Sequence, residues 1–463
     1  MDHRFSRHKK GLNIVIVGCG KVGLSLVDKL SKENHDITII DRDAGKVQDI
    51  TNLFDVNGIV GNGANFSTLQ EAGIYDTDIL IAVTNSDELN LLCCIVAKRV
   101  TDCAVIARVR TPEYSQDAAY LKSKLGLAMI INPDLESARE ISRILCLPSA
   151  VGVTPFARGL AEMIRFRIPE GNRLDGRCLR ELGQELAGAV LICAVERGGE
   201  VYIPDGNFGL QAGDVVSFIA PTRGSKQFLR RIGLETHQVR DALIIGGSKT
   251  GYYLAKQLLR VGVNVFLIES DRQHCEELST QLPKATILNG DGTDADLLRE
   301  AGIEHVGAVV PLTGIDEENI MLTLHTQAVS RAKVVTKINR IMFPEAIDRL
   351  NLGSVVYPKA LVTDAIVAYV RSRTASKASS NIETLLHLFD NRVEAIEFVA
   401  NADSPVVGRP LRELHTRDHL LVACISHKGS ILIPGGDDSI QPGDSVIIVT
   451  THTGLGDLAD ILA

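Results

Sequence analysis

Residues 12–23 read LNIVIVGCGKVG, an apolar run of strand length that leads into a Gly-x-Gly-x-x-Gly turn. Apolar residues then recur on one face of residues 21–30, which predicts a helix directly after the turn. In this context Gly18 makes the tight turn, Gly20 lets a pyrophosphate approach the backbone, and Gly23 lets the helix pack closely on the strand. The helix N-terminus then faces the phosphates, so the stretch predicts a Rossmann-type nucleotide site.

An acidic residue follows the turn at the distance that such a site requires. Residues 36–41 form the predicted second strand, and Asp41 stands at its end. A carboxylate there can accept both ribose hydroxyls of an adenosine group. Asp41 argues against a ribose 2′-phosphate, although the adjacent Arg42 leaves that ligand open. The structural alternative is a glycine-rich turn that binds nothing.

Strands and helices alternate in the residues that follow. Residues 79–83, 104–108 and 128–131 are short apolar runs typical of buried strands, and residues 87–99 have a helical pattern. This alternation predicts a parallel sheet with helices on both faces.

Polar residues follow two of these strands at the predicted carboxyl edge of the sheet. The sequence Thr84-Asn85-Ser86-Asp87 fits a Thr-x-x-Asp capping box at the start of the next helix. A capped helix start at this edge also lies where a dinucleotide binds, so ligand contact and capping are compatible. Arg108 ends the next strand and is either a phosphate partner or a solvated surface charge. We favour the phosphate partner.

This whole pattern occurs twice in the chain. Glu-Ala-Gly-Ile at 71–74 recurs at 300–303, which is 229 residues later, and the Asp-Glu-x-Asn sequences at 87–90 and 316–319 have the same spacing. A register that holds over this length indicates a duplication rather than chance.

The second copy differs from the first at several site positions. Its turn at 246–251 keeps the outer glycines, but Ser248 stands where the first copy has Gly20, while Glu269 preserves the ribose acid. The other counterparts are Thr313, Gly314 in place of Asn85, Asp316, and Lys337 in place of Arg108. The adenosine half of the second site is therefore predicted to be intact and the pyrophosphate half weakened. Such a site favours a mononucleotide or stays empty.

A small unit rich in short β-runs follows each Rossmann-like copy. In the first, residues 189–195, 200–203 and 215–219 are separated by glycine turns, which is typical of hairpins. Its Gln-Ala-Gly-Asp turn at 211–214 recurs as Gln-Pro-Gly-Asp at 441–444. The chain is therefore predicted to be α/β, with two Rossmann-like parallel-sheet domains that are each followed by a small α+β domain.

The predicted order is a Rossmann-like domain at 11–133, a crossover helix at 134–149, a small domain at 150–235, a second Rossmann-like domain at 240–358, a helix and linker at 359–381, and a second small domain at 382–463. The apolar helices at 135–145 and 361–370 are expected to pack on another subunit or on the other half. The polar stretch at 374–381 predicts a flexible linker.

Composition excludes several classes of protein. There are 49 Lys and Arg against 57 Asp and Glu, and a net charge of −8 makes nucleic acid an improbable partner. No apolar run approaches the roughly 20 residues that span a bilayer, and the basic start leads into a strand rather than a secretory signal. Nine scattered cysteines without a Cys-x-x-Cys pair indicate reduced thiols in a cytoplasm and no zinc site.

No catalytic constellation is evident. Tyr252 and Lys256 have the Tyr-x-x-x-Lys spacing of short-chain dehydrogenases, but they fall on the helix after the glycine turn rather than beside a nicotinamide. His415 and His419 are expected to be a surface pair. We therefore expect no enzymatic activity.

The two Rossmann-like copies, with Gly61-Asn62-Gly63 and Gly290-Asp291-Gly292 after their third strands, resemble the RCK (KTN) domains. The doubled order resembles the peripheral NAD-binding subunits of Trk-type potassium uptake systems over roughly 12–463. This resemblance implies a cytoplasmic homo-oligomer, a dimer or tetramer ring, at the inner face of the cell membrane. It implies that the ring docks under a membrane potassium-transporting subunit of the Trk type and regulates it as NAD or NADH, or ADP or ATP, binds.

The family's nucleotide contacts carry over to Gly18, Cys19, Gly20, Lys21, Val22, Gly23, Asp41, Thr84, Asn85 and Arg108 in the first copy, and to Gly246, Gly247, Ser248, Lys249, Thr250, Glu269, Thr313 and Lys337 in the second. The alternative function is an NAD-dependent oxidoreductase whose small domains bind substrate. A third is a scaffold with a vestigial nucleotide fold, which the two preserved ribose acids disfavour.

Overall fold

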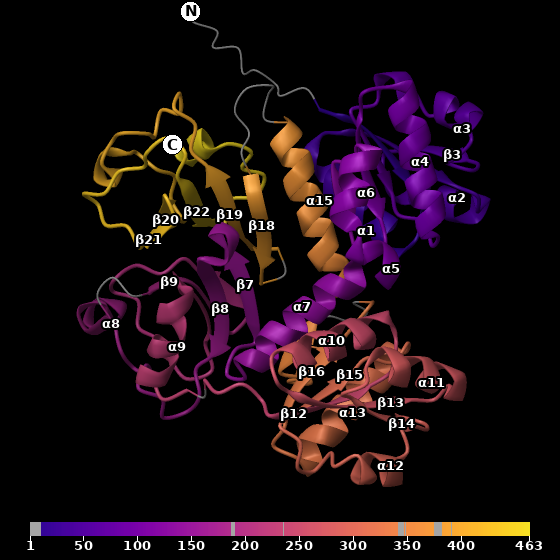
Figure 1. Ribbon diagram of the computed structural model, residues 1–463. Helices are drawn as coiled ribbons and strands as arrows, with labels where there is room; N and C mark the ends of the chain where they lie inside the picture. The colour runs from indigo at the N-terminus through magenta and orange to yellow at the C-terminus, as the bar shows by residue number, and fades with distance from the viewer. Residues whose placement is uncertain are drawn as a thin grey trace, which may run out of the picture. The chain divides into compact units, whose positions relative to one another are not determined.

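The computed structural model describes residues 11–186, 190–234, 236–340, 347, 349–374, 382–389 and 391–463. The chain forms two compact units, one of residues 1–133 with 359–380 and the other of residues 134–358 with 381–463. Figure 1 colours the chain from indigo at its start to yellow at its end. The linker predicted at 374–381 lies outside the described residues, apart from Thr374.

The first unit contains a six-stranded parallel sheet with the order β3-β2-β1-β4-β5-β6. Its strands are β1 (Asn13–Val17), β2 (Asp36–Asp41), β3 (Asn57–Val60), β4 (Ile79–Ala82), β5 (Ala104–Arg108) and β6 (Met129–Ile131). Because β1 lies between β2 and β4, the strand order reverses there, and the carboxyl ends of these strands border a crevice. The predicted Rossmann-like sheet is confirmed.

The connecting helices of this unit are α1 (Lys21–Leu30), η1 (Ser31–Glu33), α2 (Ala44–Leu53), α3 (Phe66–Glu71), η2 (Ile74–Asp76), α4 (Asp87–Val100), α5 (Pro112–Gln116) and α6 (Ala118–Leu125). Helix α1 buries Val22, Leu26 and Leu30, which are the apolar residues that recur on one face of its sequence. Since this face packs on the sheet, the start of α1 is fixed at the carboxyl end of β1.

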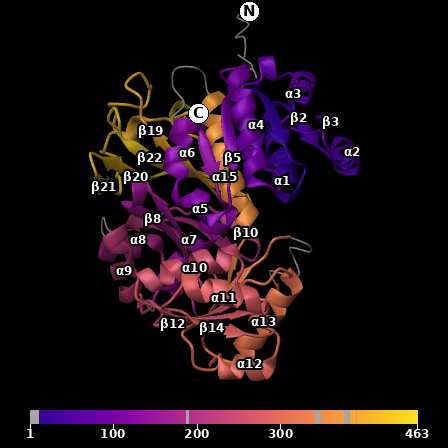
Figure 2. The ribbon, with the colours of Figure 1, turned by 45° about the vertical axis from the view of Figure 1, so that its right-hand side comes forward.

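The two long helices that follow the Rossmann domains are exchanged between the halves. Helix α15 (Pro358–Thr374) follows the second Rossmann domain, yet from Lys359 on it belongs to the first unit. Asp364 of α15 lies 2.5 Å from Lys29, and Arg371 lies 2.6 Å from Glu33. Figures 1 and 2 both draw α15 beside the first sheet. Helix α15 was expected to pack on another subunit or on the other half of the chain, and it packs on the other half.

Helix α7 (Pro133–Cys146) makes the reciprocal exchange, because from Asp134 on it belongs to the second unit. The carboxylate of Asp134 accepts a buried hydrogen bond of 2.8 Å from the hydroxyl of Thr250, which stands in the second glycine turn. Each Rossmann domain is thus completed by the helix that follows the other.

The second Rossmann domain repeats the first sheet with the order β14-β13-β12-β15-β16-β17. Its strands are β12 (Asp241–Ile245), β13 (Asn264–Glu269), β14 (Thr286–Asn289), β15 (Ala308–Pro311), β16 (Lys333–Lys337) and β17 (Ser354–Val356). Its helices include α10 (Lys249–Arg260), α11 (Arg272–Gln281), α12 (Ala295–Glu300) and α13 (Asp316–Val329).

Each small domain is built on a five-stranded antiparallel sheet, ordered β10-β9-β11-β8-β7 in the first and β18-β19-β22-β20-β21 in the second. The first contains β7 (Gly152–Phe156), η3 (Ala157–Gly159), β8 (Ala161–Arg167), α8 (Leu179–Leu186), β9 (Leu191–Arg197), β10 (Glu200–Tyr202), β11 (Val215–Pro221) and α9 (Thr222–Arg231). The second contains β18 (Ile382–Leu388), β19 (Val393–Val399), η4 (Leu411–Glu413), β20 (Leu420–His427), β21 (Ser430–Leu432), β22 (Ser445–Thr450) and η5 (Leu458–Ile461).

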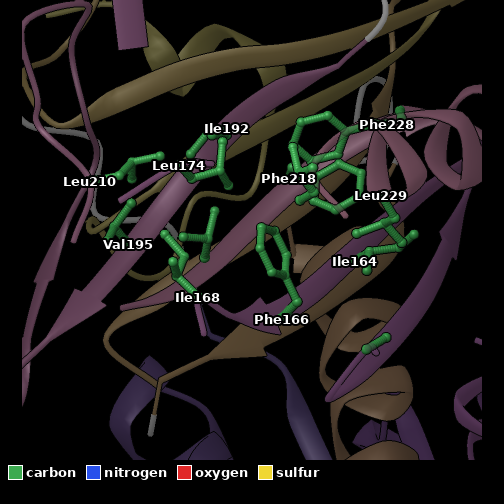
Figure 3. Close-up of a cluster of buried hydrophobic side chains, with 14 of the residues drawn as sticks. Ile164, Phe166, Ile168, Leu174, Ile192, Val195, Leu210, Phe218, Phe228 and Leu229 are labelled. Atoms are coloured by element: carbon green, nitrogen blue, oxygen red, sulfur yellow. The ribbon is translucent and has the colours of Figure 1, made fainter. Parts of the chain in front are cut away.

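The first small domain has its own aromatic core, which Figure 3 shows between the sheet and α9. Phe166, Phe218 and Phe228 pack edge to face, with ring centroids 4.7 to 6.3 Å apart. Edge-to-face rings are favourable beyond the area they bury. This core explains why α9 stays on the sheet although it carries several exposed cations.

The two small domains also share a second core. Phe156 and Met163 from the first pack with Phe389 and Ile447 from the second in one buried cluster. Glu397, which is 1% exposed, accepts the backbone N–H of Ala157 across this contact at 3.0 Å. The two small domains are therefore one packed body within the second unit.

A buried lysine joins the second Rossmann domain to the chain between α7 and β7. Lys333, the first residue of β16, donates a hydrogen bond of 2.6 Å to the carbonyl of Ala150. Burial lowers the pKa of Lys333 from 10.5 to about 8.

Among the described residues, no helix has both the length and the apolar character that a bilayer crossing requires.

This lysine predicts a pH dependence of stability. Because the folded chain holds this proton less tightly than the unfolded chain, the free energy of unfolding should rise with pH between about 8 and 10.5, by up to about 1.4 kcal/mol per pH unit. Urea unfolding across that range measures it. In Lys333→Met this rise should be missing, and an unchanged slope in that variant would contradict the assignment.

Candidate functional site

The first and third glycines of the turn are required by the packing of the backbone. Gly18 has a φ of +109°, and a Cβ atom there would lie 2.8 Å from the backbone nitrogen of Thr84. A Cβ atom on Gly23 would lie 2.0 Å from the carbonyl oxygen of Gly18. Gly20 is different, because no atom lies within 4 Å of the place where its Cβ would stand. Its missing side chain leaves open space rather than serving the fold.

Asp41 holds the glycine turn in place from the end of β2. Its Oδ2 accepts the backbone N–H of Cys19 at 2.6 Å, and its Oδ1 accepts the backbone N–H of Asp43 at 3.0 Å. Each oxygen can accept a second hydrogen bond. Asp41 is therefore preorganised, with acceptor capacity left for a pair of ribose hydroxyls.

A cavity of about 150 Å³ lies at the crevice where the strand order reverses. It is lined by Val17, Gly18, Gly20, Ile40, Asp41, Arg42, Lys46, Gly61, Asn62, Gly63, Val83, Thr84, Asn85 and Leu89. Five of the predicted site residues line it, namely Gly18, Gly20, Asp41, Thr84 and Asn85. The crevice position is the one at which open α/β sheets bind ligands.

The other predicted residues of the first copy do not line this cavity. Cys19 and Val22 are buried, Lys21 is exposed, and Gly23 packs against the turn. Lys46 lines the cavity and was missed by the sequence prediction. A basic residue three positions after Asp43, the residue that caps α2, was the available signal.

Arg108 is neither solvated nor in the cavity wall. It is 8% exposed, and its Nη2 donates to the carbonyl of Thr84 and, at 3.2 Å, to the side chain of Asn85. The alternative of a solvated surface charge is therefore wrong. Through these hydrogen bonds, the guanidinium of Arg108 holds in place the loop that borders the cavity.

Asn90 is the residue that connects this loop to the rest of the sheet. Its side chain is fully buried, and its Oδ1 accepts the backbone N–H of Thr84 at 2.8 Å. Its Nδ2 donates to the carbonyls of Arg108, at 2.9 Å, and Thr84, at 3.1 Å. Asn90 thus joins α4 to the ends of β4 and β5. The repeated Asp-Glu-x-Asn sequence was its signal, although no role was predicted for Asn90.

The predicted capping box is corrected by the structure. Helix α4 begins at Asp87, and its N-cap is Ser86, whose hydroxyl accepts the backbone N–H of Leu89 at 3.1 Å. The hydroxyl of Thr84 instead donates to Asn90 at 2.7 Å. Two residues lie between Thr84 and the helix, so the loop is free to border the cavity.

The second glycine turn has the same backbone but a different set of contacts. Gly246 has a φ of +111°, and a Cβ on Gly251 would lie 2.4 Å from the carbonyl oxygen of Gly246. Glu269 accepts the backbone N–H of Gly247 at 2.9 Å, as Asp41 does for Cys19. A Cβ on Gly247 would lie 2.8 Å from the carboxylate of Glu269. It would also lie 2.6 Å from Cδ1 of Leu278, so Glu269 and Leu278 together leave no room for a side chain at this position.

The remaining predicted residues of the second copy fall into two groups. Ser248 and Lys249 are exposed at the start of α10. Thr250 is buried, and its hydroxyl donates to Asp134 of α7 instead of facing an open site. Lys337 is buried and donates to the carbonyl of Leu312 at 3.1 Å. The loop after β15 is organised like its counterpart, because Asn319 accepts the backbone N–H of Thr313 at 2.8 Å.

Comparisons with known proteins agree with this doubled architecture. Residues 14–133 and 242–358 match the TrkA-N domain family, and residues 163–233 and 395–463 match the TrkA-C domain family. The chain is 31% identical to "Trk system potassium uptake protein TrkA homolog 2" of Methanosarcina mazei over 445 residues, covering 94% of this chain and 97% of that protein. It is also 31% identical to the "Trk system potassium uptake protein TrkA homolog" of Archaeoglobus fulgidus, covering 94% and 97%.

Among solved structures, the "GsuK channel bound to NAD" is similar in fold, with a TM-score of 0.62, 19% identity, and coverage of 96% of this chain and 77% of that chain. The resemblance to tandem RCK domains that the sequence indicated is confirmed by these matches. With two TrkA-N domains that are each followed by a TrkA-C domain, and with relatives matched over nearly their whole length, this chain belongs to the TrkA family of Trk system potassium uptake proteins.

Proposed function

We propose that this protein is a nucleotide-binding regulatory subunit of a membrane potassium transporter, and that the nucleotide binds in the first Rossmann domain. The observation that carries the proposal is the turn at Gly20, where the backbone faces open space beside a cavity bordered by Asp41 and Thr84. The family relatives are named for potassium uptake, and the GsuK channel, which is similar in fold, is known bound to NAD. These names support a role in potassium transport and a nucleotide ligand.

The residues present fit NAD or NADH, with ADP or ATP as further ligands of the same site. The backbone at Gly20 and the N-terminus of α1 would hold the pyrophosphate, because the helix dipole and free N–H groups favour anions there. Asp41 would hold the adenosine ribose. Thr84 and Asn85 border the opposite side of the cavity. A ligand that contacts both sides can shift the protein only by its different affinity for two conformations.

The subunit is proposed to act at the inner face of the cell membrane, as a homo-oligomer that docks on a Trk-type potassium-transporting partner. The expected assembly is a dimer or a tetramer ring. A mass measurement at micromolar concentration tests assembly, and a strictly monomeric chain would contradict it.

The competing function, an NAD-dependent oxidoreductase, lacks a suitable residue among those described. Cys19 is beside the turn, but burial and the charge of Asp41 raise the pKa of its thiol to about 12, so it is not a thiolate near neutral pH. Tyr252 and Lys256 bond to each other on α10 at 3.2 Å. His415 and His419 are exposed on the second small domain. None of these residues lines the cavity.

Titration of the purified chain with NAD, NADH, ADP and ATP tests the proposal directly. We expect saturable binding of at least one of the four. Incubation of the NADH complex with alcohols, hydroxy acids or aldehydes should leave the absorbance of reduced nicotinamide unchanged. Steady turnover would favour the oxidoreductase, and an absence of binding by all four nucleotides would contradict the proposed site.

Replacing Asp41 by alanine should weaken nucleotide binding in the first domain about tenfold to a hundredfold, because hydrogen bonds to a charged acceptor contribute roughly 1.5 to 3 kcal/mol. Part of this loss comes from the turn, which loses its contact at Cys19. Calorimetry measures the affinity. Asp41→Asn is the matched variant, since its single oxygen can keep the contact with Cys19 in the turn, while the charge and the acceptor for Asp43 are lost. Unchanged affinity in Asp41→Ala would exclude the ribose assignment.

A further inference from the structure

The second Rossmann domain has a histidine contact that the first domain lacks. His274 lies in the first turn of α11, and its Nε2 is 2.8 Å from the carbonyl oxygen of Gly247 in the glycine turn. Its Nδ1 is 3.2 Å from the carboxylate of Glu277. One imidazole ring therefore connects the helix to the turn.

The two partners of His274 determine its protonation. A backbone carbonyl and a carboxylate are both acceptors, so each ring nitrogen must donate a proton for both contacts to exist. Partial burial lowers the pKa of His274, but the contacts with Gly247 and Glu277 and the charge of Glu269 raise it further, to above its ordinary value. The titratable groups that act on the ring are Glu277 from α11 and Glu269 from β13.

The first domain shows what this position does without the histidine. Asp43 caps α2 and Asp271 caps α11, and three residues later stand Lys46 and His274 respectively. Lys46 lines the first cavity and lies 3.4 Å from the carboxylate of Asp43. His274 is thus at the edge where the first domain has its cavity, but its ring reaches the turn itself.

Glu269, the carboxylate predicted to bind ribose in the second domain, also accepts more hydrogen bonds from the protein than Asp41 does. Oε1 of Glu269 accepts the hydroxyl of Ser270 at 3.1 Å and the backbone N–H of Asp271 at 2.9 Å, while Oε2 accepts Gly247. Asp41 accepts one backbone N–H on each oxygen. A carboxylate oxygen has two lone pairs. Glu269 therefore has one acceptor position left, whereas Asp41 has two.

We propose that His274 is a proton-dependent latch on the second glycine turn, so that protons and an adenine nucleotide compete for the second Rossmann domain. Below the pKa of the ring the latch is closed. Above it, Nδ1 loses its proton and the contact with Glu277 breaks. The neutral ring can still donate from Nε2 to the carbonyl of Gly247, but this hydrogen bond is no longer charge-assisted and loses about half of its strength, so the turn opens more readily. The proposal rests on the proposed function in one respect, that this fold binds adenine nucleotides.

The test uses the full chain with Asp41→Ala, which weakens the first site, and measures ADP binding by calorimetry at about pH 6 and about pH 8. Affinity at the second site should be about tenfold higher at the higher pH, the effect of one charge-assisted hydrogen bond. The matched variant adds His274→Gln, which keeps a donor for the carbonyl of Gly247 but does not titrate. Since ADP itself titrates in this range, the result is the difference between these two chains.

The outcomes separate the latch from the site in the first domain. If His274→Gln leaves the pH dependence unchanged, or if the Asp41→Ala chain binds no ADP at either pH, the latch is excluded. The wild-type chain titrated in parallel reports on the first domain. Its failure to bind any nucleotide would overturn the proposed function as well, whereas normal binding there limits the failure to His274. Equal unfolding midpoints confirm that the variants are folded.

Discussion

Replacing the buried Asn90 by leucine is expected to lower the free energy of unfolding of the first Rossmann domain by about 3 kcal/mol and to abolish nucleotide binding there. The apolar side chain leaves the backbone N–H of Thr84 and the carbonyl of Arg108 without the partner that Asn90 provides, and the carbonyl of Thr84 keeps only its contact with the Arg108 side chain. The loop that borders the cavity then loses its connection to α4. Urea unfolding measures the stability, and NAD titration measures the site.

The duplication supplies the control for this prediction. Asn319 makes the same contacts in the second domain, with the backbone N–H of Thr313 and the carbonyls of Thr313 and Lys337. Asn319→Leu should therefore destabilise the second domain by a similar amount while leaving the affinity of the first site unchanged. If both variants reduced NAD affinity equally, the loss would come from general destabilisation and not from the loop at Thr84.

The fold could be predicted from the sequence because its signals are local and occur twice. The strand–turn–helix around Gly18, the acid at Asp41 and the apolar strands recur in the second copy at a nearly constant spacing. Apolar periodicity and glycine spacing report on backbone geometry, which both copies share. The two sheets and the two small domains follow from these signals.

The remaining features depend on contacts between residues that are distant in sequence. No local pattern indicates that Arg108 is covered by the loop at Thr84, or that Thr250 bonds to Asp134 of the exchanged helix. Glycine at position 247 is explained only when the side chains of Leu278 and Glu269 are seen beside it. The sequence could identify these residues as unusual but could not assign their partners.

The exchange of α7 and α15 also determines how the two sites have to be compared. A chain cut between the halves would separate each Rossmann domain from the helix that packs on it, including the Lys29–Asp364 pair and the Thr250–Asp134 hydrogen bond. Differences between isolated halves would then reflect damaged packing. The sites must be distinguished in the full chain, by substitutions that leave the fold intact.

Gly20 offers such a substitution. Because no atom lies within 4 Å of its missing Cβ, Gly20→Ser should leave the unfolding midpoint unchanged, yet the side chain would hold a pyrophosphate away from the backbone and reduce NAD affinity about a hundredfold. The reverse change, Ser248→Gly, should add NAD affinity in the second domain.

Gly23→Ala is the contrasting control for Gly20→Ser, since its Cβ would lie 2.0 Å from the carbonyl oxygen of Gly18, so it should lower stability directly. Calorimetry and thermal unfolding of the three full-length variants measure both effects. Unchanged NAD affinity in Gly20→Ser would show that the open space at this glycine is not where the pyrophosphate binds.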